Sequence, residues 1–370
     1  MSEDRTHNDN KVDDRIWLDS YEAGVPDGIG EIRYDSVAAY IQDCCNRFAE
    51  LPALSNFGVS LSYAEFQEKS AAVAGFFQNS LKLSKGDRLA IVLPNLMQYP
   101  VTLLGALEAG LIVVNFNPSY TQRELLLQLN DSGAAAIVIF SGCAHLLHGV
   151  LDRSPLKHVI VAEAGDLFPR WRAAMINYFV KYTGRKIPAW KLPDAIPFTN
   201  ALKSHVNFVP VILTHEDPAF LQYTGGTTGF SKGAILSHGN ILANIEQTNL
   251  WVRAHLREKQ ERVIVALPLY HIFGLTINFL SSLQLGGLHV LITDPRNTRA
   301  LIRTMKKTGV TVFMGVNALF AKLMNIPAFR KLDFRNLRLV IGGGAAVQSN
   351  LAEQWQDLTG VAICQAYGLT

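Results

Sequence analysis

The sequence predicts an α/β protein made of two doubly wound units with mainly parallel sheets. Short, continuously apolar runs recur along most of the chain, and such runs are typical of parallel strands that helices cover on both faces. Segments with helical character separate these runs. Of the 370 residues, 49% are hydrophobic and 18% are charged, so the chain can fill two cores and is too apolar for a disordered protein.

The first unit is expected to span residues 16–165, after a disordered N-terminus at residues 1–15 that lacks the apolar stretch of a signal peptide. A helix is predicted at Met97–Ala109, and Thr121 with Glu124 forms a capping box for the next one. The strands of this unit are predicted at Arg88–Leu93, Leu111–Phe116, Ala134–Phe140 and His158–Ala162.

The second unit is expected to span residues 211–370, and residues 166–210 form a basic, aromatic insertion between the two units. Asn240 is the predicted N-cap of a helix that follows two short strands. The strands of this unit are predicted at Ala219–Tyr223, Ala234–Leu236, Arg262–Leu267, Leu288–Ile292, Val310–Met314, Leu337–Ile341 and Val361–Gln365.

The most informative segment is Tyr223–Gly233, which holds four glycines, three threonines, a serine and a lysine between two apolar runs. Glycines let a loop turn its backbone N–H groups toward an anion, and hydroxyl groups and a lysine add further donors. A Walker loop would run straight into a helix and have serine or threonine after its lysine, whereas Gly233 follows Lys232 here. A plain turn needs no such set of donors, so the segment is predicted to be a strand–loop–strand phosphate clamp. Its expected phosphate ligands are Thr224, Gly225, Gly226, Thr227, Thr228, Gly229, Ser231 and Lys232.

Three further motifs follow in order: PLYHIFG at Pro268–Gly274, IGGGA at Ile341–Ala345 and AYGLT at Ala366–Thr370. With the glycine-rich loop, they resemble the motifs of the adenylate-forming superfamily of acyl-CoA synthetases, luciferases and adenylation domains. Gly225 stands where many members have serine, a variant similar to bacterial long-chain fatty-acid–CoA ligases. The resemblance runs from about Ile16 to the last residue, and it implies two packed sheets with helices between and outside.

The resemblance implies ATP and Mg²⁺ as cofactors and CoA as a co-substrate. Thr224 would lie near the Mg²⁺, and Thr370 would contact the α-phosphate or the acyl carbonyl. Tyr367 would offer a flat face to adenine, and residues 343–345 would line the purine edge with backbone, although Gly342–Gly344 also suits a tight strand-to-helix turn. The expected residues of this part of the site are Gly343, Gly344, Ala345, Gln365, Ala366, Tyr367, Gly368 and Thr370.

His271, Phe273 and Gly274 are expected to border the acyl group. A lone histidine after a strand also fits a structural role; because a fatty carboxylate is already ionised at neutral pH, we expect His271 to position substrate rather than act as a base. The motif contains no aspartate to pair with an ammonium group, which argues against an amino acid substrate. Leu275, Ile277, Phe279 and Leu280 suit an alkyl chain and suit an ordinary core helix equally well. The expected catalytic residues are Thr224, Lys232, His271 and Thr370.

Composition excludes several other classes of protein. A net charge of +3 is too small to indicate nucleic-acid binding. The four cysteines have no Cys-x-x-Cys spacing, so neither zinc nor a disulfide framework is indicated. Val263–Thr293 carries no charged residue and exceeds transmembrane length, but polar residues and Gly286-Gly287 interrupt it. We expect a buried strand, turn, helix and strand there rather than a membrane span.

Phe168–Pro193 contains six basic residues and no acidic one. If it is helical, Trp171, Met175, Tyr178 and Tyr182 form one amphipathic stripe with basic neighbours, which suits an anionic membrane surface. The alternative is that the stripe packs against the protein itself. The expected location is cytoplasmic, peripherally associated with the inner face of the cell membrane, and a homodimer is compatible with the sequence.

Two functions of different classes follow. The first is a long-chain fatty-acid–CoA ligase, and the alternative is a non-catalytic relative that binds nucleotide or acyl groups. The chain stops at Thr370, where the family continues with a Mg²⁺-binding glutamate and further domains, and Gln365-Ala366 replaces the commoner Glu-Gly pair. We therefore expect a truncated chain that makes no acyl-CoA alone. A dinucleotide oxidoreductase is excluded because Val347 occupies the third glycine position of a GxGxxG motif.

Overall fold

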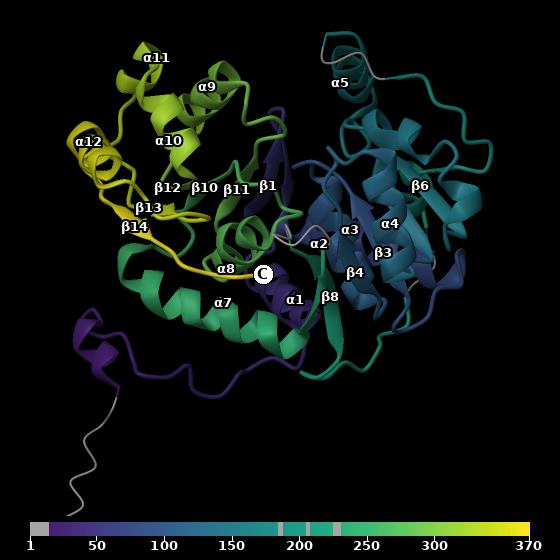
Figure 1. Ribbon diagram of the computed structural model, residues 1–370, viewed down its shortest axis with the longest axis horizontal. Coiled ribbons are helices and arrows are strands. Elements are labelled where there is room, and N and C mark those ends of the chain that lie inside the picture. Colours follow the sequence, from purple (N-terminus) through teal and green to yellow (C-terminus); the bar gives the residue numbers. More distant parts are fainter. Residues whose placement is uncertain (1–14, 184–187, 205–207, 225–230) are drawn as a thin grey trace, which may run out of the picture.

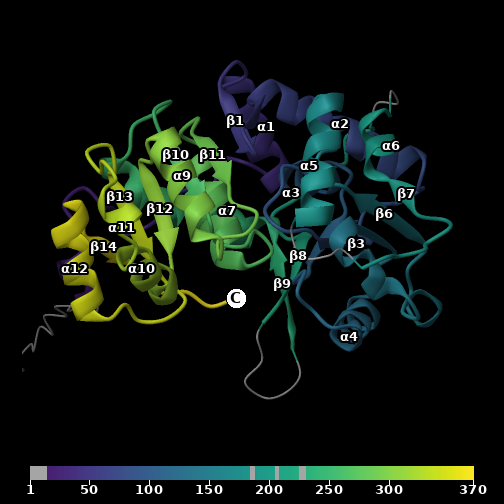
Figure 2. The same ribbon diagram turned by 90° about the horizontal axis from the view of Figure 1, so that it is seen from above.

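The structure, a computed structural model, describes residues 15–183, 188–204, 208–224 and 231–370. These residues form two seven-stranded sheets that lie next to each other, with helices between and outside them (Figures 1 and 2). We call them sheet A, with the strand order β14-β13-β12-β10-β11-β1-β2, and sheet B, with the order β7-β6-β5-β3-β4-β8-β9. The predicted fold class, with two packed and mainly parallel sheets, is confirmed.

Sheet B is parallel except for its edge hairpin, in which β8 and β9 are antiparallel. The strands predicted in the first half of the chain are found here within two residues of their expected bounds. Its strands are β3 (Arg88–Val92), β4 (Ile112–Asn115), β5 (Ala136–Phe140), β6 (His158–Ala162), β7 (Ile196–Pro197), β8 (Pro218–Tyr223) and β9 (Gly233–Ser237).

Sheet A is parallel except for the β1–β2 hairpin at its edge. Five of the strands predicted for the second unit lie here, each within about two residues of its expected bounds, and the other two, at Ala219–Tyr223 and Ala234–Leu236, lie in sheet B. Its strands are β1 (Pro52–Asn56), β2 (Val59–Ser62), β10 (Arg262–Val265), β11 (Leu288–Leu291), β12 (Val312–Gly315), β13 (Leu339–Gly342) and β14 (Ile363–Gln365).

The two halves of the chain exchange strands, which the expected division at residues 166–210 does not capture. Leu54 of β1 pairs with His289 of β11, so an early hairpin completes sheet A. Conversely, Phe220 of β8 pairs with Val113 of β4, so a late hairpin completes sheet B. The sheets therefore do not coincide with residues 16–165 and 211–370. An apolar run predicts a strand but carries no information on which sheet that strand joins.

Helices fill three layers around the two sheets. The helices are η1 (Ile16–Ser20), α1 (Val37–Arg47), α2 (Tyr63–Asn79), α3 (Gln98–Glu108), α4 (Gln122–Ser132), η2 (Ser141–Leu147), η3 (Leu151–Arg153), α5 (Arg170–Thr183), α6 (Phe198–Leu202), α7 (His238–Val252), η4 (Arg253–His255), η5 (Phe273–Leu280), α8 (Ser281–Leu283), α9 (Thr298–Thr308), α10 (Asn317–Met324), α11 (Pro327–Arg330) and α12 (Ser349–Thr359). The strands alternate between layers: Val263 and Val265 of β10 face the core between the sheets, and Ile264 faces the outer helices.

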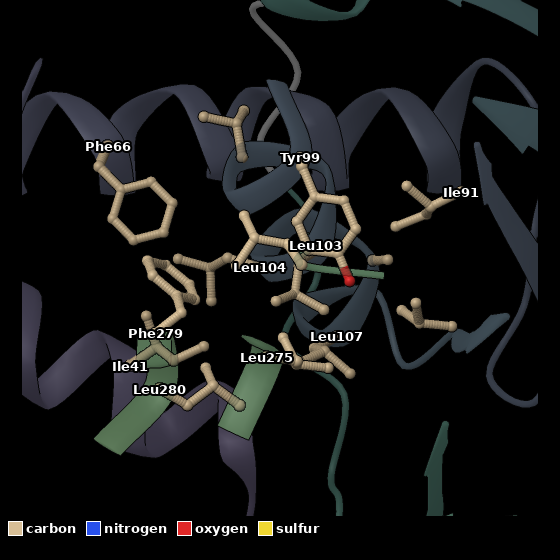
Figure 3. Close-up of a cluster of buried hydrophobic side chains, with 14 of the residues drawn as sticks. Ile41, Phe66, Ile91, Tyr99, Leu103, Leu104, Leu107, Leu275, Phe279 and Leu280 are labelled. Carbon is tan, nitrogen blue, oxygen red and sulfur yellow. The ribbon is translucent and has the colours of Figure 1, made fainter. Parts of the chain in front are cut away.

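Helix α3 and the π-helix η5 form the centre of the core between the sheets. Tyr99, Leu103 and Leu107 of α3 face Leu275 and Phe279 of η5 (Figure 3). All five side chains are fully buried, and each contributes about 1.5–3 kcal/mol relative to an exposed position. The two sheets are therefore joined by one continuous apolar core.

Two local predictions are decided by capping geometry. The hydroxyl of Thr121 accepts from the backbone N–H of Glu124, and the Glu124 carboxylate accepts from the N–H of Thr121, so this capping box is confirmed. The predicted N-cap Asn240 is wrong. Helix α7 starts earlier because Ser237 is its N-cap, and Asn240 is the third residue of that capping box.

The uncharged run Val263–Thr293 divides into β10, a turn, the helices η5 and α8, and β11, as expected. In the part of the chain that the structure describes, every helix is too short or too polar to cross a bilayer. The four cysteines are free thiols, and Cys44 and Cys45 are buried.

Candidate functional site

The β8–β9 hairpin carries the glycine-rich loop, which confirms the predicted strand–loop–strand arrangement. Tyr223 pairs with Gly233 in the ladder. Beyond this pair, the Thr224 N–H donates to the Lys232 carbonyl at 3.0 Å, and the Ser231 hydroxyl donates to the Thr224 carbonyl. Both backbone polar groups of Thr224 are thus engaged, so its hydroxyl is what it can offer a ligand. Lys232 is exposed at the base of the loop.

Most of the loop lies outside the described residues. The expected phosphate ligands within that gap stay predictions: Gly225, Gly226, Thr227, Thr228 and Gly229.

The loop from Pro268 to Gly274 leaves the carboxyl end of β10 and turns into η5. The turn is so tight that a Cβ atom on Gly274 would collide with the carbonyl oxygen of Pro268, so only glycine fits there. The backbone N–H of Phe273 donates to Nδ1 of His271 at 3.3 Å. A neutral imidazole that accepts at Nδ1 carries its proton on Nε2. His271 therefore presents a hydrogen-bond donor beyond the loop.

His271 reaches the surface, but the protein atoms around its ring lower its pKa from the ordinary value by burial. The neutral form is therefore favoured at pH 7. A neutral Nε2–H donor can orient an oxygen of a phosphate or carboxylate, which agrees with the predicted positioning role.

The turn after β13 meets this loop directly. A Cβ atom on Gly343 would lie 2.9 Å from the Phe273 ring and 3.2 Å from the Ala366 carbonyl oxygen, so this close approach requires glycine. Ala366 in turn donates its N–H to the Gly342 carbonyl at 2.8 Å. Three of the sequence motifs therefore meet at the carboxyl ends of sheet A, where ligands bind in open α/β sheets.

The remaining predicted residues differ in what they offer a ligand. The side-chain oxygen of Gln365 accepts from the Val347 N–H at 3.2 Å, so it serves the turn after β13. The Tyr367 side chain is 91% exposed, and its ring is open to a partner. Gly344 and Ala345 lie in the exposed turn, and Gly368 is exposed beside Tyr367. The C-terminal end of the chain, Thr370, lies near β8 in both views (Figures 1 and 2).

Three buried amides behind this surface were not predicted from the sequence: Asn95, Asn115 and Gln222. Each stands at or just after the carboxyl end of a sheet B strand. The available signal was a polar amide within or directly after an apolar run, as in Leu93-Pro94-Asn95 and Leu221-Gln222-Tyr223.

The chemistry of the described residues limits how a metal ion could be held. They contain no group of three His, Cys, Asp or Glu side chains that could bind one. Mg²⁺ retains several waters and is commonly held by substrate phosphates together with one or two protein oxygens. The Thr224 hydroxyl fits such a minor role.

Comparisons with known proteins agree on one family. The model of the AMP-binding enzyme family matches residues 41–370. A long-chain-fatty-acid–CoA ligase from Escherichia coli O157:H7 is 47% identical over 358 residues, which is 96% of this chain and 64% of that protein. A protein of the same name from Haemophilus influenzae is 41% identical, with the same shares covered. The chain thus spans about 64% of the length of these relatives.

Solved structures share the fold at lower identity. The crystal structure of a long-chain-fatty-acid-CoA ligase from Archaeoglobus fulgidus has a TM-score of 0.74 at 22% identity, covering 93% of this chain and 64% of that one. An anthranilate CoA ligase in complex with anthranoyl-AMP has a TM-score of 0.76 at 18% identity, covering 90% and 59%.

Proposed function

The chain belongs to the AMP-binding enzyme family, and on that premise we propose that the protein carrying it is a long-chain fatty-acid–CoA ligase. In the first step, a carboxylate oxygen of the fatty acid attacks the α-phosphorus of ATP, and the bond to the β-phosphate breaks to release pyrophosphate. In the second, the thiol sulfur of CoA attacks the acyl carbonyl, its proton is lost, and AMP leaves. Relatives named long-chain-fatty-acid–CoA ligase, 41–47% identical, support this choice.

The first step brings a carboxylate against a polyphosphate, so the site must neutralise charge and hold the reactants in line. Lys232, the Thr224 hydroxyl and the glycine-rich loop would bind the β- and γ-phosphates. The Nε2–H of His271 would orient an oxygen at the junction of acyl group and phosphate. Tyr367 and the turn at Gly343 would hold adenine, and Thr370 would contact the α-phosphate. Mg²⁺, held by the ATP phosphates and the Thr224 hydroxyl, would supply further positive charge.

A single observation carries the proposal: His271, Phe273, Gly343 and Ala366 gather at the carboxyl ends of sheet A, and the hairpin that carries Thr224 and Lys232 is hydrogen-bonded to the residue before His271. The motif around His271 has no carboxylate that could pair with an ammonium group. This supports a fatty acid over an amino acid as substrate.

The test is ATP–pyrophosphate exchange by the full-length protein that carries this chain, with fatty acids of increasing length. Exchange that depends on a long-chain fatty acid is expected, followed by acyl-CoA formation when CoA is added. Nucleotide binding without exchange for any carboxylic acid would favour the alternative, a non-catalytic binding protein.

We further propose that α5 docks the enzyme on an anionic membrane, where long-chain fatty acids partition. Trp171, Met175, Tyr178 and Phe179 are each more than half exposed on this helix, at the rim of the molecule in Figure 1. Aromatic rings at this density suit the headgroup region, and each nearby basic residue adds about 1 kcal/mol on an anionic surface.

Two hydrogen bonds anchor α5 to segments that adjoin both sheets. Asn177 accepts from the Gly165 N–H at 2.8 Å beside sheet B, and Arg172 donates to the Gly58 carbonyl at 3.2 Å in the β1–β2 turn. The helix is therefore fixed with its aromatic residues outward. The alternative, in which the stripe packs on the protein, is not supported for Trp171 and Met175; the Tyr182 side chain lies outside the described residues.

Liposome co-sedimentation tests the membrane proposal. Binding to anionic vesicles should weaken with salt and fall when Arg170, Arg185 and Lys186 become glutamine. The matched control changes Arg303, Lys306 and Lys307 of the basic helix α9, which has no aromatic stripe. Equal loss in both variants would mean that only overall charge matters. The homodimer stays a prediction, which sedimentation analysis of the same protein checks.

A further inference from the structure

We infer that two buried amides, Asn95 after strand β3 and Gln222 on strand β8 of sheet B, are positioning residues. They hold the loop Pro268–Gly274, which we call the His271 loop, in register with the β8–β9 hairpin. The loop itself belongs to sheet A, because it continues β10. The inference deepens the proposed function and rests on it only where activity is the readout.

Asn95 follows β3 and is 4% exposed. Its side-chain oxygen accepts from the Leu269 N–H at 2.9 Å. Its NH₂ group donates to the Leu267 carbonyl at 2.8 Å and to the Val265 carbonyl at 3.0 Å. One side chain from sheet B thus binds three backbone groups where β10 ends and the His271 loop begins.

Gln222 lies on β8, two positions before Thr224, and is 3% exposed. Its NH₂ group donates to the Tyr270 carbonyl at 2.8 Å, on the residue directly before His271. Its oxygen accepts from the Asn115 NH₂ group at 2.9 Å, and the Asn115 oxygen accepts from the Tyr99 hydroxyl at 2.7 Å. The Gln222 side chain is therefore itself held by a buried chain of hydrogen bonds.

Together, the two amides connect the parts that the proposed reaction must align. One strand carries both Gln222 and, after Tyr223, the phosphate-binding residue Thr224. The bond to Tyr270 fixes that strand against the neighbour of His271. Buried hydrogen bonds of this kind resist sliding because breaking one leaves an unpaired polar group in the core. A shift of about 1 Å between reacting groups can cost roughly a hundredfold in rate.

Hydrogen exchange tests the inference without relying on activity. In Gln222→Met, which keeps the volume but removes both hydrogen bonds, amide exchange in residues 267–273 should rise by roughly tenfold or more. Asn95→Ala should raise exchange in the same segment. Gln98→Met is the matched control, because Gln98 is an equally buried amide that donates to the Glu163 and Ala164 carbonyls instead. That control should leave exchange in residues 267–273 unchanged.

A double-mutant cycle tests the consequence for catalysis. If Gln222 acts through the His271 loop, Gln222→Met should lower the kcat of pyrophosphate exchange, with the KM for ATP changed by no more than about twofold. Adding it to His271→Ala should then cost no more than about a further twofold. Unchanged amide exchange in residues 267–273, or fully multiplicative effects on kcat, would overturn the inference. If the protein shows no fatty-acid-dependent pyrophosphate exchange, the proposed function is refuted. The amide hydrogen-exchange result then decides the positioning role alone.

Discussion

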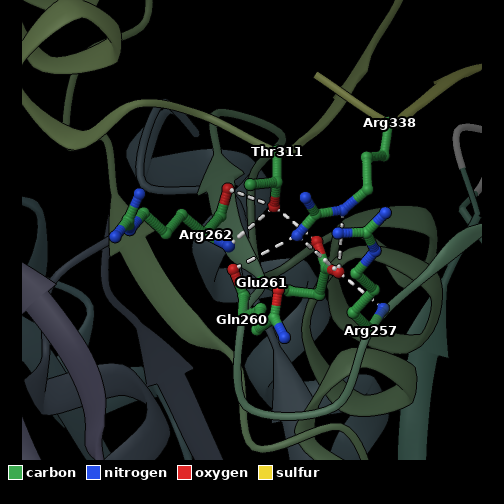
Figure 4. Close-up of polar contacts among 6 residues, drawn as sticks. All are labelled: Arg257, Gln260, Glu261, Arg262, Thr311 and Arg338. Atoms are coloured by element: carbon green, nitrogen blue, oxygen red, sulfur yellow. Dashed lines mark hydrogen bonds and ion pairs between the residues drawn. The ribbon is translucent and has the colours of Figure 1, made fainter. Parts of the chain in front are cut away.

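The polar groups of sheet A differ in their environment between the amino ends of its strands, which we call the amino edge, and the carboxyl ends, which we call the carboxyl edge. At the amino ends of the strands, Glu261 is buried and forms an ion pair with Arg338 at 3.0 Å (Figure 4). The Thr311 hydroxyl and the Arg257 N–H also donate to its carboxylate, at 2.5 and 2.7 Å. At the carboxyl ends, by contrast, His271 and Tyr367 are exposed and the backbone turns through glycines.

The polar groups at the amino edge stabilise the fold, whereas those at the carboxyl edge can bind a ligand. The Glu261 cluster joins the beginnings of β10, β12 and β13, and its donors and acceptors are used within the protein. The carboxyl edge keeps donors such as the Nε2–H of His271 directed outward. We therefore expect substitutions at the amino edge to change stability and substitutions at the carboxyl edge to change activity.

The largest effect is expected for Arg338→Met at the amino edge. Removing one partner leaves the Glu261 carboxylate buried without its counter-ion, which should lower the free energy of unfolding by about 3–5 kcal/mol. Urea unfolding measures this. The control is Arg335→Met, because Arg335 pairs with Asp333 on the exposed surface and should contribute no measurable stability. Equal stability of the two variants would contradict the assigned role of the cluster.

His289 and His271 test the comparison through the pH dependence of stability. His289 is fully buried, with Nε2 2.7 Å from the Ser282 hydroxyl and Nδ1 3.1 Å from the Ala53 carbonyl oxygen, and burial lowers its pKa to about 4. Below pH 6.5 the unfolded chain binds a proton that the folded protein cannot yet accept. The stabilising contribution of the neutral His289 is therefore fully present above pH 6.5. As the pH falls from 6.5 to 4, the free energy of unfolding decreases by about 3 kcal/mol.

The measurement compares unfolding midpoints of the wild type and His289→Asn between pH 7 and pH 4. The variant should be less stable at pH 7 and should lose less stability on acidification. His271→Asn, at the exposed edge, should follow the wild-type pH dependence more closely. Parallel curves for the wild type and His289→Asn would show that this histidine does not drive acid destabilisation.

The smallest effect is expected at the hairpin itself. Ser231→Ala removes the hydroxyl that donates to the Thr224 carbonyl, a neutral hydrogen bond at an exposed position. The loss should be about 0.5–1.5 kcal/mol in transition-state stabilisation, with no change in the unfolding midpoint. Steady-state kinetics of pyrophosphate exchange measure this loss. A change in stability as large as that of Arg338→Met would mean that the hairpin serves folding.

The sequence was informative where local chemistry decides the outcome. The alternation of β3 to β6 with helices, the Thr121–Glu124 capping box and the two strands that flank the glycine-rich loop all follow from neighbouring residues. It was less informative where contacts are distant along the chain. Nothing in residues 52–62 indicates that they pair beside β11, which begins at Leu288.

The site shows the same limit. The motifs around His271 and Gly343 could be located from the sequence, but not the contact between Phe273 and Gly343 that joins them. Asn95 and Gln222 were missed because the groups that they bind in the His271 loop are backbone groups, and any sequence supplies these. The misplaced N-cap at Asn240 arose because Ser237 and Asn240 are both good capping residues, and only geometry distinguishes them.

The most direct test of the central claim is to measure pyrophosphate exchange and unfolding in parallel for Lys232→Ala, Thr224→Ala and Arg338→Met. For the two hairpin variants, we predict a roughly ten- to hundredfold loss of fatty-acid-dependent exchange, equivalent to about 1.5–3 kcal/mol, at an unchanged unfolding midpoint. For Arg338→Met, we predict the reverse: a large loss of stability with near-normal exchange per folded molecule. Near-normal exchange in both Lys232→Ala and Thr224→Ala would contradict the assignment of the phosphate site to this hairpin.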